Sequence, residues 1–308
     1  MNLKQLQLVC TMVQADFNVS KTANIMHTTQ PGISALLKSL EDELNVKLFN
    51  RLGKRITGLT DAGHEIHTNA QQALINIKSI KDIGLEYSGK QKGSLAIATT
   101  HTQARYVLPQ VINKFAKRYP KIQLKIRQGT PKQIAQMVTD GEADFAIATE
   151  SIVDYQKLAI VPVYEWNRCI LTPKTHPLVK LKKKITLKEI AAHPIITYDF
   201  AFAGRSVTQK AFSEKNLTPN VVLTALDSDV IKTYVELDLG IGLLAAMAYN
   251  KKIDTNLHFI EASHLFENST TFVGFRKGQF LRQYIIDFLL WLAPHITYED
   301  IVSANEGN

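Results

Sequence analysis

Apolar residues in the first part of the chain recur at steps of three and four, the spacing of helices with one buried face. The pattern predicts a first helix over residues 3–17, a second that runs to residue 27 with Asn18 or Ser20 as its cap, and a third capped by Thr29. We therefore expect three short helices joined by tight turns. The positions expected to be buried in the third helix are Ile33, Leu37, Leu40 and Leu44.

A basic turn and a long helix follow. Residues 48–57 place Gly53 in a basic tip between two apolar edges, which predicts a short hairpin. Thr60 can cap the next helix, which at about 28 residues and about 1.5 Å per residue is about 42 Å long. Its apolar positions alternate steps of four and three, as in a coiled coil, and its length favours a dimer-forming linker over a helix packed on a globular core. These positions are Ile66, Ala70, Ala73, Ile77, Ile80 and Gly84.

The pattern changes at residues 88–93, a polar stretch with two glycines that predicts a hinge. Beyond it, short segments rich in β-formers alternate with helical ones, which is typical of a parallel sheet covered by helices. We expect an α/β domain of about 200 residues. The expected strands span residues 95–99, 122–126, 145–148, 195–197, 221–224 and 243–246.

Length and composition fit a cytoplasmic protein of several domains. At 308 residues the chain exceeds one ordinary core, and 45% of its residues are hydrophobic. Apolar stretches such as residues 241–248 fall short of the roughly 18 to 20 residues that cross a bilayer. The first residues lack the basic, apolar and small-residue regions of a secretory signal, so we expect no membrane association.

Positive charge is concentrated rather than spread. The net charge is +8, yet residues 1–90 carry ten Lys or Arg against eight Asp or Glu, hence only +2. Residues 47–55 contain four of these cations and no acid. This distribution favours a local contact with phosphate groups over a broad basic arm.

Metal and catalytic motifs are missing from the sequence. The nine histidines are scattered, and there is no CxxC pair, P-loop, GxGxxG or nucleophile elbow. His101 is the best candidate for a catalytic base, but it has no evident nucleophile partner. Cys10 and Cys169 lie among apolar residues, as small buried thiols do. We expect no enzyme activity, no metal site and no cofactor.

The start of the third helix carries groups that suit base recognition. It begins with Gln30, Pro31, Gly32, Ile33 and Ser34, at the end of the helix that enters the major groove in helix-turn-helix proteins. Glutamine pairs with adenine through its amide, and serine bonds several base edges. Three small helices alone indicate plain packing more often than DNA binding. The basic turn makes the two interpretations equal.

A second group of polar residues lies where a strand gives way to a helix. Thr100, Thr102 and Gln103 follow the expected strand 95–99, the usual ligand position in open α/β sheets. Hydroxyl and amide donors beside helix N–H groups favour an anion. The alternative interpretation is that these residues only cap the helix that follows the strand.

Five ordered motifs resemble the LysR-type transcriptional regulators. They span residues 18–23, 29–34, 40–44, 48–51 and 59–63. Residues 98–106 and 229–234 are similar to the CysB-like subgroup of that family, which regulates cysteine and sulfur genes. The likeness covers nearly the whole chain.

The resemblance implies an α/β multidomain fold with three parts. These are a winged helix-turn-helix over residues 1–59, a linker helix over 60–88 and an effector domain over 89–308. The effector domain would be periplasmic-binding-protein-like, with lobe I at 92–161 and 271–295 and lobe II at 162–270. Two hinge strands would cross near Val161 and Thr271, and a helix over residues 280–292 would pack back on lobe I.

The resemblance also implies which residues bind. The DNA-contacting residues would be Thr29, Gln30, Pro31, Ser34, Lys38, Arg51, Lys54 and Arg55. The effector-contacting residues would be Thr100, His101, Thr102, Gln103, Thr149 and Ala203.

The sequence departs from the family pattern at two places. Ala35, Leu36 and Leu37 stand where many relatives carry groups that read bases, so specificity would lean on the remaining polar residues and on DNA shape. Ala203 stands where relatives usually carry a threonine, which leaves only its backbone N–H and puts the identity of the ligand in doubt.

The resemblance implies a regulator of sulfur and cysteine genes that binds double-stranded DNA, RNA polymerase and a small anion such as sulfate or an acetylserine. It would act as a homodimer or homotetramer. The alternatives are a regulator of another pathway with a different effector, and an anion solute-binding protein. The linked helix-turn-helix and the lack of a signal peptide count against the latter.

Overall fold

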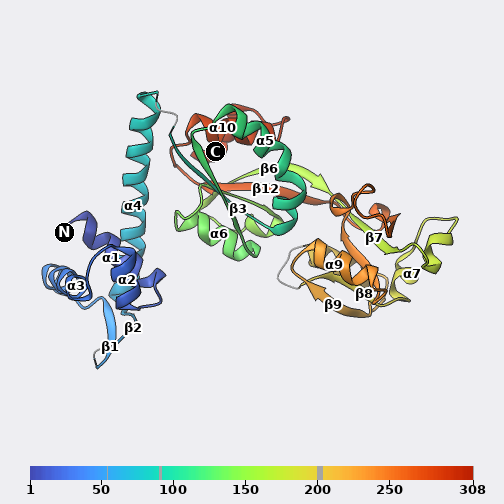
Figure 1. The fold of residues 1–308 in the computed structure, drawn as a ribbon, viewed down its shortest axis with the longest axis horizontal. Helices are drawn as coiled ribbons and strands as arrows, with labels where there is room; N and C mark the ends of the chain where they lie inside the picture. The colour runs from blue at the N-terminus through green and yellow to red at the C-terminus, as the bar shows by residue number, and fades with distance from the viewer. Residues whose placement is uncertain (54, 90–91, 200–203, 308) are drawn as a thin grey trace. The chain divides into compact units, whose positions relative to one another are not determined.

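The computed structural model describes residues 1–53, 55–89, 92–199 and 204–307, which fall into two compact units, Met1–Gly89 and Lys90–Asn308 (Figure 1). Each unit has its own hydrophobic core. None of the described helices is long and apolar enough to span a bilayer.

The N-terminal unit is three helices, a hairpin and a long helix. Leu8, Met12, Ile33, Leu37 and Leu40 fill its core, as the apolar spacing predicts. Asn18 caps the second helix and Thr29 caps the third, each by accepting a backbone N–H. The elements are α1 (Leu3–Gln14), α2 (Val19–Ile25), α3 (Gln30–Leu44), β1 (Phe49–Leu52), β2 (Arg55–Leu59) and α4 (Asp61–Tyr87).

Three boundary predictions in this unit are wrong. The first helix ends at Gln14, not at residue 17, because Asp16 and Phe17 have φ of 52° and 61°, which no right-handed helix contains. The second ends at Ile25, before the predicted residue 27. Leu44, predicted to be buried, is 36% exposed because it is the last residue of α3.

Helix α4 leaves the distal end of its expected coiled-coil face exposed, at Ile80 and Gly84. Thr60 caps it as predicted. Within the single chain only Gly63, Ala70 and Ile75 are buried, and Ile80 is 67% exposed. The distal part of the helix therefore carries apolar side chains that its own unit does not cover.

The second unit contains two five-stranded mixed sheets, one in each lobe. The sheet of the first lobe has the order β4 (Ile122–Gln128), β3 (Gly93–Thr99), β5 (Phe145–Thr149), β12 (Ser269–Arg276) and β6 (Leu158–Trp166). The sheet of the second lobe has the order β11 (Leu257–Glu261), β7 (Arg168–Pro173), β10 (Ile241–Ala245), β8 (Ile195–Tyr198) and β9 (Val221–Ala225). All six predicted strands are present, and the α/β fold is confirmed.

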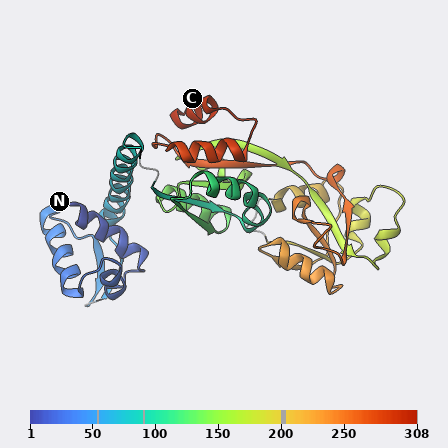
Figure 2. The same cartoon turned by 45° about the horizontal axis from the view of Figure 1, so that its top comes forward.

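Helices cover both faces of each sheet (Figures 1 and 2). In β3, Leu95 and Ile97 face one core while Ala96 and Ala98 face another, as alternation along a strand requires. On the first lobe, α5 (Leu108–Arg118) and α10 (Gln283–Leu292) pack on the former face and α6 (Pro131–Thr139) on the latter. On the second lobe, α7 (Leu187–Ala191) and α8 (Gly204–Ser213) lie opposite α9 (Ser228–Glu236).

The chain crosses between the two sheets at Asn167 and again between residues 262 and 268. Val161 and Thr271, the expected hinge positions, lie within β6 and β12, which pair antiparallel along their lengths. Helix α10 packs back on the first lobe as predicted. A further helix, α11 (Tyr298–Glu306), follows it and was not predicted.

Candidate functional site

The third helix presents its polar residues to solvent. Thr29, Gln30, Pro31, Ser34 and Lys38 are all exposed, on the side opposite the buried core residues. The Gln30 side-chain amide donates a 2.7 Å hydrogen bond to the hydroxyl of Ser20 at the start of α2. An exposed bond of this kind positions the amide and is readily exchanged for a base edge.

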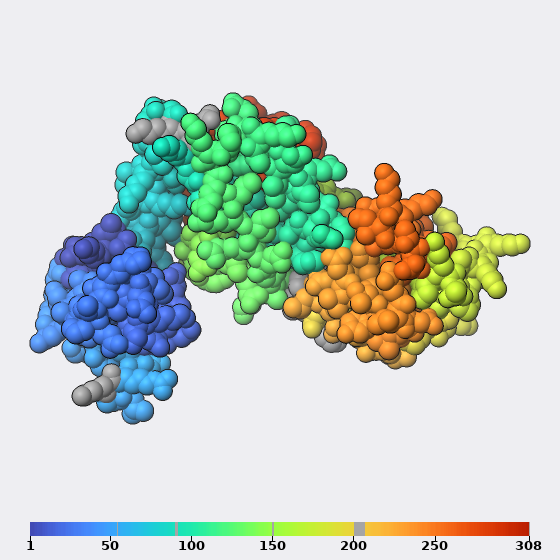
Figure 3. All heavy atoms as spheres, viewed as in Figure 1, coloured from blue at the N-terminus to red at the C-terminus, as the bar shows by residue number. Residues whose placement is uncertain are grey.

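The hairpin carries the cations. Arg51 and Arg55 are exposed in β1 and β2, and Gly53 makes the turn with φ of 61°, a conformation that glycine adopts without strain. The hairpin projects from the body of its unit (Figure 3). Lys54, also predicted to contact phosphate, lies outside the described residues.

The departure from the family pattern at residues 35–37 removes fewer potential base-reading side chains than the sequence indicates. Leu37 is buried in the core and would read no base in any relative that shares this packing. Ala35 is exposed, and Lys38 and Ser39 follow on the exposed face of the helix. The groups lost for base recognition therefore reduce to Ala35 and the half-buried Leu36.

The candidate effector site gathers the carboxyl ends of strands from both lobes. Thr100 follows β3, and Thr149 ends β5. From the second lobe, Tyr198 ends β8, Leu226 follows β9, and Ala245 ends β10. A cavity of about 40 Å³ lies between them. It is lined by Thr100, Thr102, Gln103, Thr149, Trp166, Tyr198, Leu226, Ala245 and Met247.

Four of the six predicted effector residues line this cavity: Thr100, Thr102, Gln103 and Thr149. His101 does not, because it points to another part of the lobe boundary. Ala203 lies outside the described residues. Sequence reasoning missed Trp166, Leu226, Ala245 and Met247, because their apolar and aromatic types gave no chemical signal.

Hydrogen bonds join the lobes beside the cavity. The hydroxyls of Thr102 and Ser228 are 3.3 Å apart, and Tyr198 lies 2.7 Å from the same Ser228 oxygen. The backbone N–H of Ala245 donates to the Tyr198 hydroxyl at 3.2 Å. Ser228, at the start of α9, thus contacts both sides of the cleft.

Gln103 is held by the strands that lead to the second lobe. Its amide donates a 3.4 Å hydrogen bond to Thr271 of β12, and its carbonyl oxygen accepts one from Tyr164 of β6. Burial raises the pKa of Tyr164, so that hydroxyl stays protonated and donating.

The cavity is neutral and supplies donors. No charged side chain lines it among the described residues. The indole N–H of Trp166 is buried and has no hydrogen-bond partner in the described part of the chain. Burial also raises the pKa of Tyr198, which keeps its hydroxyl neutral. The arrangement suits a small ligand that accepts several hydrogen bonds.

A charged cluster lies elsewhere on the lobe boundary. Tyr106 donates a 2.5 Å hydrogen bond to Asp229, and Arg105 and Lys232 form ion pairs with that carboxylate at 3.4 and 3.3 Å. Lys232 also pairs with Asp254 at 3.0 Å. Burial, followed by the hydrogen bond to Asp229, raises the pKa of Tyr106 to about 12. First-lobe and second-lobe groups thus meet at one carboxylate.

Comparison with known proteins gives the family. Residues 3–64 match the model of the bacterial regulatory helix-turn-helix protein, lysR family, and residues 88–296 match the LysR substrate binding domain.

Individual relatives agree over nearly full length. The chain is 47% identical to the HTH-type transcriptional regulator SsuR of Burkholderia cenocepacia, over 98% of this chain and 97% of that protein. It is 43% identical to the HTH-type transcriptional regulator CysB of the same species, over 100% and 98% of the two chains. The chain also resembles the crystal structure of the cofactor-binding domain of the Cbl transcriptional regulator, with 41% sequence identity and a TM-score of 0.68. The match covers 70% of this chain and 95% of that one.

These matches confirm the two-part architecture and the expectation of a regulator rather than an enzyme. The chain belongs to the LysR family, whose members are transcriptional regulators that bind DNA and small-molecule effectors and form oligomers.

Proposed function

We propose that this protein regulates sulfur and cysteine genes and that a small oxyanion, such as sulfate or an acetylserine, controls it from the cavity between the lobes. The relatives named SsuR and CysB support the pathway. The observation that carries the ligand class is the neutral cavity lined by Thr100, Thr102 and Thr149, which carry hydroxyls, and by Trp166, whose buried indole N–H has no partner among the described residues.

The size of the cavity favours the smaller ligand. One water molecule needs roughly 10–15 Å³ of such space, so about 40 Å³ holds a group of only a few atoms. A tetrahedral oxyanion such as sulfate meets this limit with the lobes as they stand. An acetylserine has about twice as many heavy atoms and requires the lobes to open.

The mechanism follows from the bonds across the cleft. An anion that accepts hydrogen bonds from residues of both lobes stabilises one closure angle, because it binds that arrangement more tightly than others. In a homotetramer, closure would re-space the DNA-binding units and alter DNA bending and contact with RNA polymerase. Thr29, Gln30, Pro31, Ser34 and Lys38 would contact the major groove, and Arg51, Lys54 and Arg55 would contact phosphates.

Calorimetric titration of the full chain tests the effector. We expect sulfate or thiosulfate to bind and an unrelated dicarboxylate not to bind. Thr100→Val, which removes one hydroxyl at nearly constant shape, should weaken binding by about tenfold or more, since a hydrogen bond to a charged group contributes about 1.5–3 kcal/mol. Thr139→Val is the matched control, because its hydroxyl bonds the Ala135 carbonyl in α6.

Two results would decide against the proposal. Binding of the dicarboxylate but of no sulfur compound would favour the alternative of a LysR-family regulator of another pathway. Sulfate binding that is unchanged in Thr100→Val would place the anion elsewhere.

A further inference from the structure

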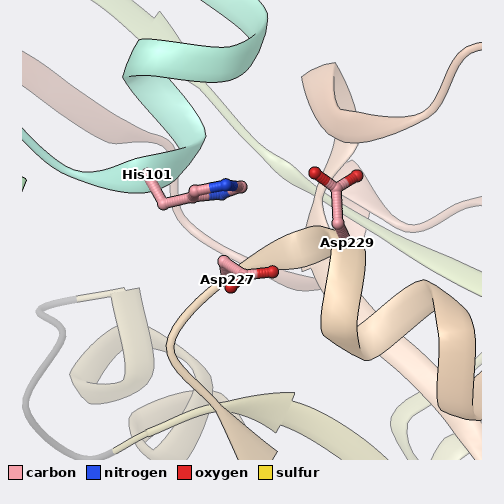
Figure 4. A group of neighbouring side chains, drawn as sticks. All are labelled: His101, Asp227 and Asp229. Atoms are coloured by element: carbon pink, nitrogen blue, oxygen red, sulfur yellow. The ribbon is translucent and has the colours of Figure 1, made fainter.

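Three metal-binding side chains from both lobes meet beside the effector cavity. His101 belongs to the first lobe, whereas Asp227 and Asp229 stand at the start of α9 in the second. One ligand atom from each lies within 4.8 Å of the others. Figure 4 shows the His101 imidazole extending toward the two carboxylates.

The two segments that build this group also build the effector cavity, by alternation. Thr100 and Thr102 flank His101 and line the cavity. On the opposite segment, Leu226 lines the cavity and Ser228 bonds Thr102, while Asp227 and Asp229 turn to His101. Each segment thus presents one set of residues to the cavity and the intervening set to the second group.

The His101 imidazole is the member of the group that carries an unsatisfied buried nitrogen. Its Nδ1 atom is buried and has no hydrogen-bond partner among the described residues. A buried ring nitrogen without a hydrogen-bond partner costs free energy, which a bound cation or a water molecule offsets. This atom is therefore the observation that points to a missing ligand.

Asp227 can accept a cation without losing its structural role, whereas Asp229 would exchange its hydrogen bond from Tyr106 and its two ion pairs for the ion. One oxygen of Asp227 caps α9 by accepting the Val230 N–H at 2.8 Å, and an ion can use the other oxygen. Lys232 keeps its pair with Asp254 if Asp229 turns to an ion. Arg105, the partner of the second Asp229 oxygen, has a side chain that is 58% exposed and can move into solvent.

We propose that His101, Asp227 and Asp229 form a site for a divalent metal ion of the zinc class that bridges the two lobes. Imidazole nitrogen and carboxylate oxygen are both ligands of Zn²⁺, at distances of about 2.0–2.2 Å. Around a tetrahedral ion with bonds of about 2.0–2.2 Å the ligand atoms lie about 3.3 Å apart. Because they are now within 4.8 Å of one another, side-chain rotations that shorten each distance by up to about 1.5 Å complete the site. Three protein ligands leave one position open for water.

The ion would couple to the effector. Because its ligands come from both lobes, it stabilises the closed arrangement that also forms the cavity, and each ligand then tightens the binding of the other. This coupling rests on the proposed effector function, whereas metal binding itself does not.

The test titrates the full-length protein, stripped with a chelator, with CoCl₂ and then ZnCl₂ in the absence of any effector. We expect one Co²⁺ per chain with the visible absorption of a tetrahedral site, displaced by Zn²⁺. His101→Asn and Asp227→Asn should each weaken binding by more than about tenfold, since even outer-shell changes at metal sites cost about 10- to 100-fold. Asn at position 227 keeps the helix cap, and unfolding without metal checks that both variants fold.

The chain offers a matched control. His176 and His193 form a ring pair at 4.7 Å on the second lobe and are the natural site for adventitious metal. His176→Asn keeps the cap to Leu178 and should bind Co²⁺ like the wild type. Absence of binding, binding that survives His101→Asn, or binding lost in His176→Asn would each overturn the proposal; absence of metal binding with normal effector binding would leave the proposed function standing.

Discussion

The backbone N–H of Leu48 donates a 2.9 Å hydrogen bond to the carboxylate of Glu41, which is only 3% exposed. Glu41 lies in α3 and Leu48 immediately precedes β1, so this bond fixes the hairpin to α3. The other carboxylate oxygen pairs with Lys47 at 3.1 Å. The spacing between α3 and the hairpin thus depends on one buried carboxylate.

Removing that carboxylate should destabilise the N-terminal unit. We expect Glu41→Ala to lower the free energy of unfolding by about 1–3 kcal/mol, because the buried Leu48 N–H loses its partner. Lys47→Ala should change it by less than about 0.5 kcal/mol, since the Lys47 side chain is 71% exposed. Urea unfolding measures both. Equal losses would show that the ion pair, not the backbone bond, stabilises the junction.

Two glycines of α4 should respond to alanine with opposite signs. A Cβ at Gly63 would stand 2.0 Å from the Leu48 carbonyl oxygen, so Gly63→Ala must push the helix from the hairpin and cost about 1–3 kcal/mol. Nothing lies within 4 Å of a Cβ at Gly84, and Gly84→Ala should stabilise by about 0.4–1 kcal/mol through helix propensity. Thermal unfolding of the two variants distinguishes them; a gain from Gly63→Ala would contradict the close approach.

Base-reading residues should govern discrimination rather than overall affinity. Gln30→Ala and Ser34→Ala should narrow the difference between a selected operator and random DNA, by about 1–3 kcal/mol if Gln30 pairs bidentately with a base. Fluorescence anisotropy with the two DNAs measures this. Unchanged discrimination in both variants would mean that other groups read the sequence.

The wing, which is the β1–β2 hairpin, should govern overall affinity rather than discrimination between DNA sequences. Arg55→Ala should weaken binding to operator and random DNA alike and lower the slope of log affinity against log salt by about 0.9, the loss of one phosphate contact. Lys4→Ala in α1, an exposed cation outside the wing, is the control. A loss confined to the operator would give Arg55 a reading role instead.

Neither cysteine should react while the chain is folded. Cys10 and Cys169 are thiols that are both buried, as their apolar neighbours predicted. Burial, reinforced by the charges of Glu261 and Asp254, raises the pKa of Cys169, so little thiolate forms at pH 8. Ellman's reagent should titrate both thiols only after denaturation; rapid labelling of Cys169 at pH 8 would show that β7 opens.

The sequence alone determined the elements and much of their chemistry. Helix periodicity, capping residues such as Thr29 and Thr60, and the glycine-tipped basic turn predicted the N-terminal unit, because these signals act over a few neighbouring residues. The strands after residue 93 followed from the same local reasoning. Thr100, Thr102 and Gln103 were candidates because polar residues follow a strand there, but only the family resemblance favoured them over routine helix capping and added Thr149.

Only the tertiary structure decided which distant residues meet. Leu226 and Met247 line the cavity without any local sign, and Trp166 matters because its buried indole N–H has no partner in the described part of the chain. Leu37 is buried, so position 37 is not available to read a base whichever residue occupies it. Asp16 and Phe17 adopt left-handed backbone conformations, which end α1 earlier than the sequence predicted. His101 meets Asp227 and Asp229 across the lobes, more than 120 positions away in the sequence. Such contacts depend on how the two sheets pack, and that free energy is distributed over whole cores rather than encoded in any short segment.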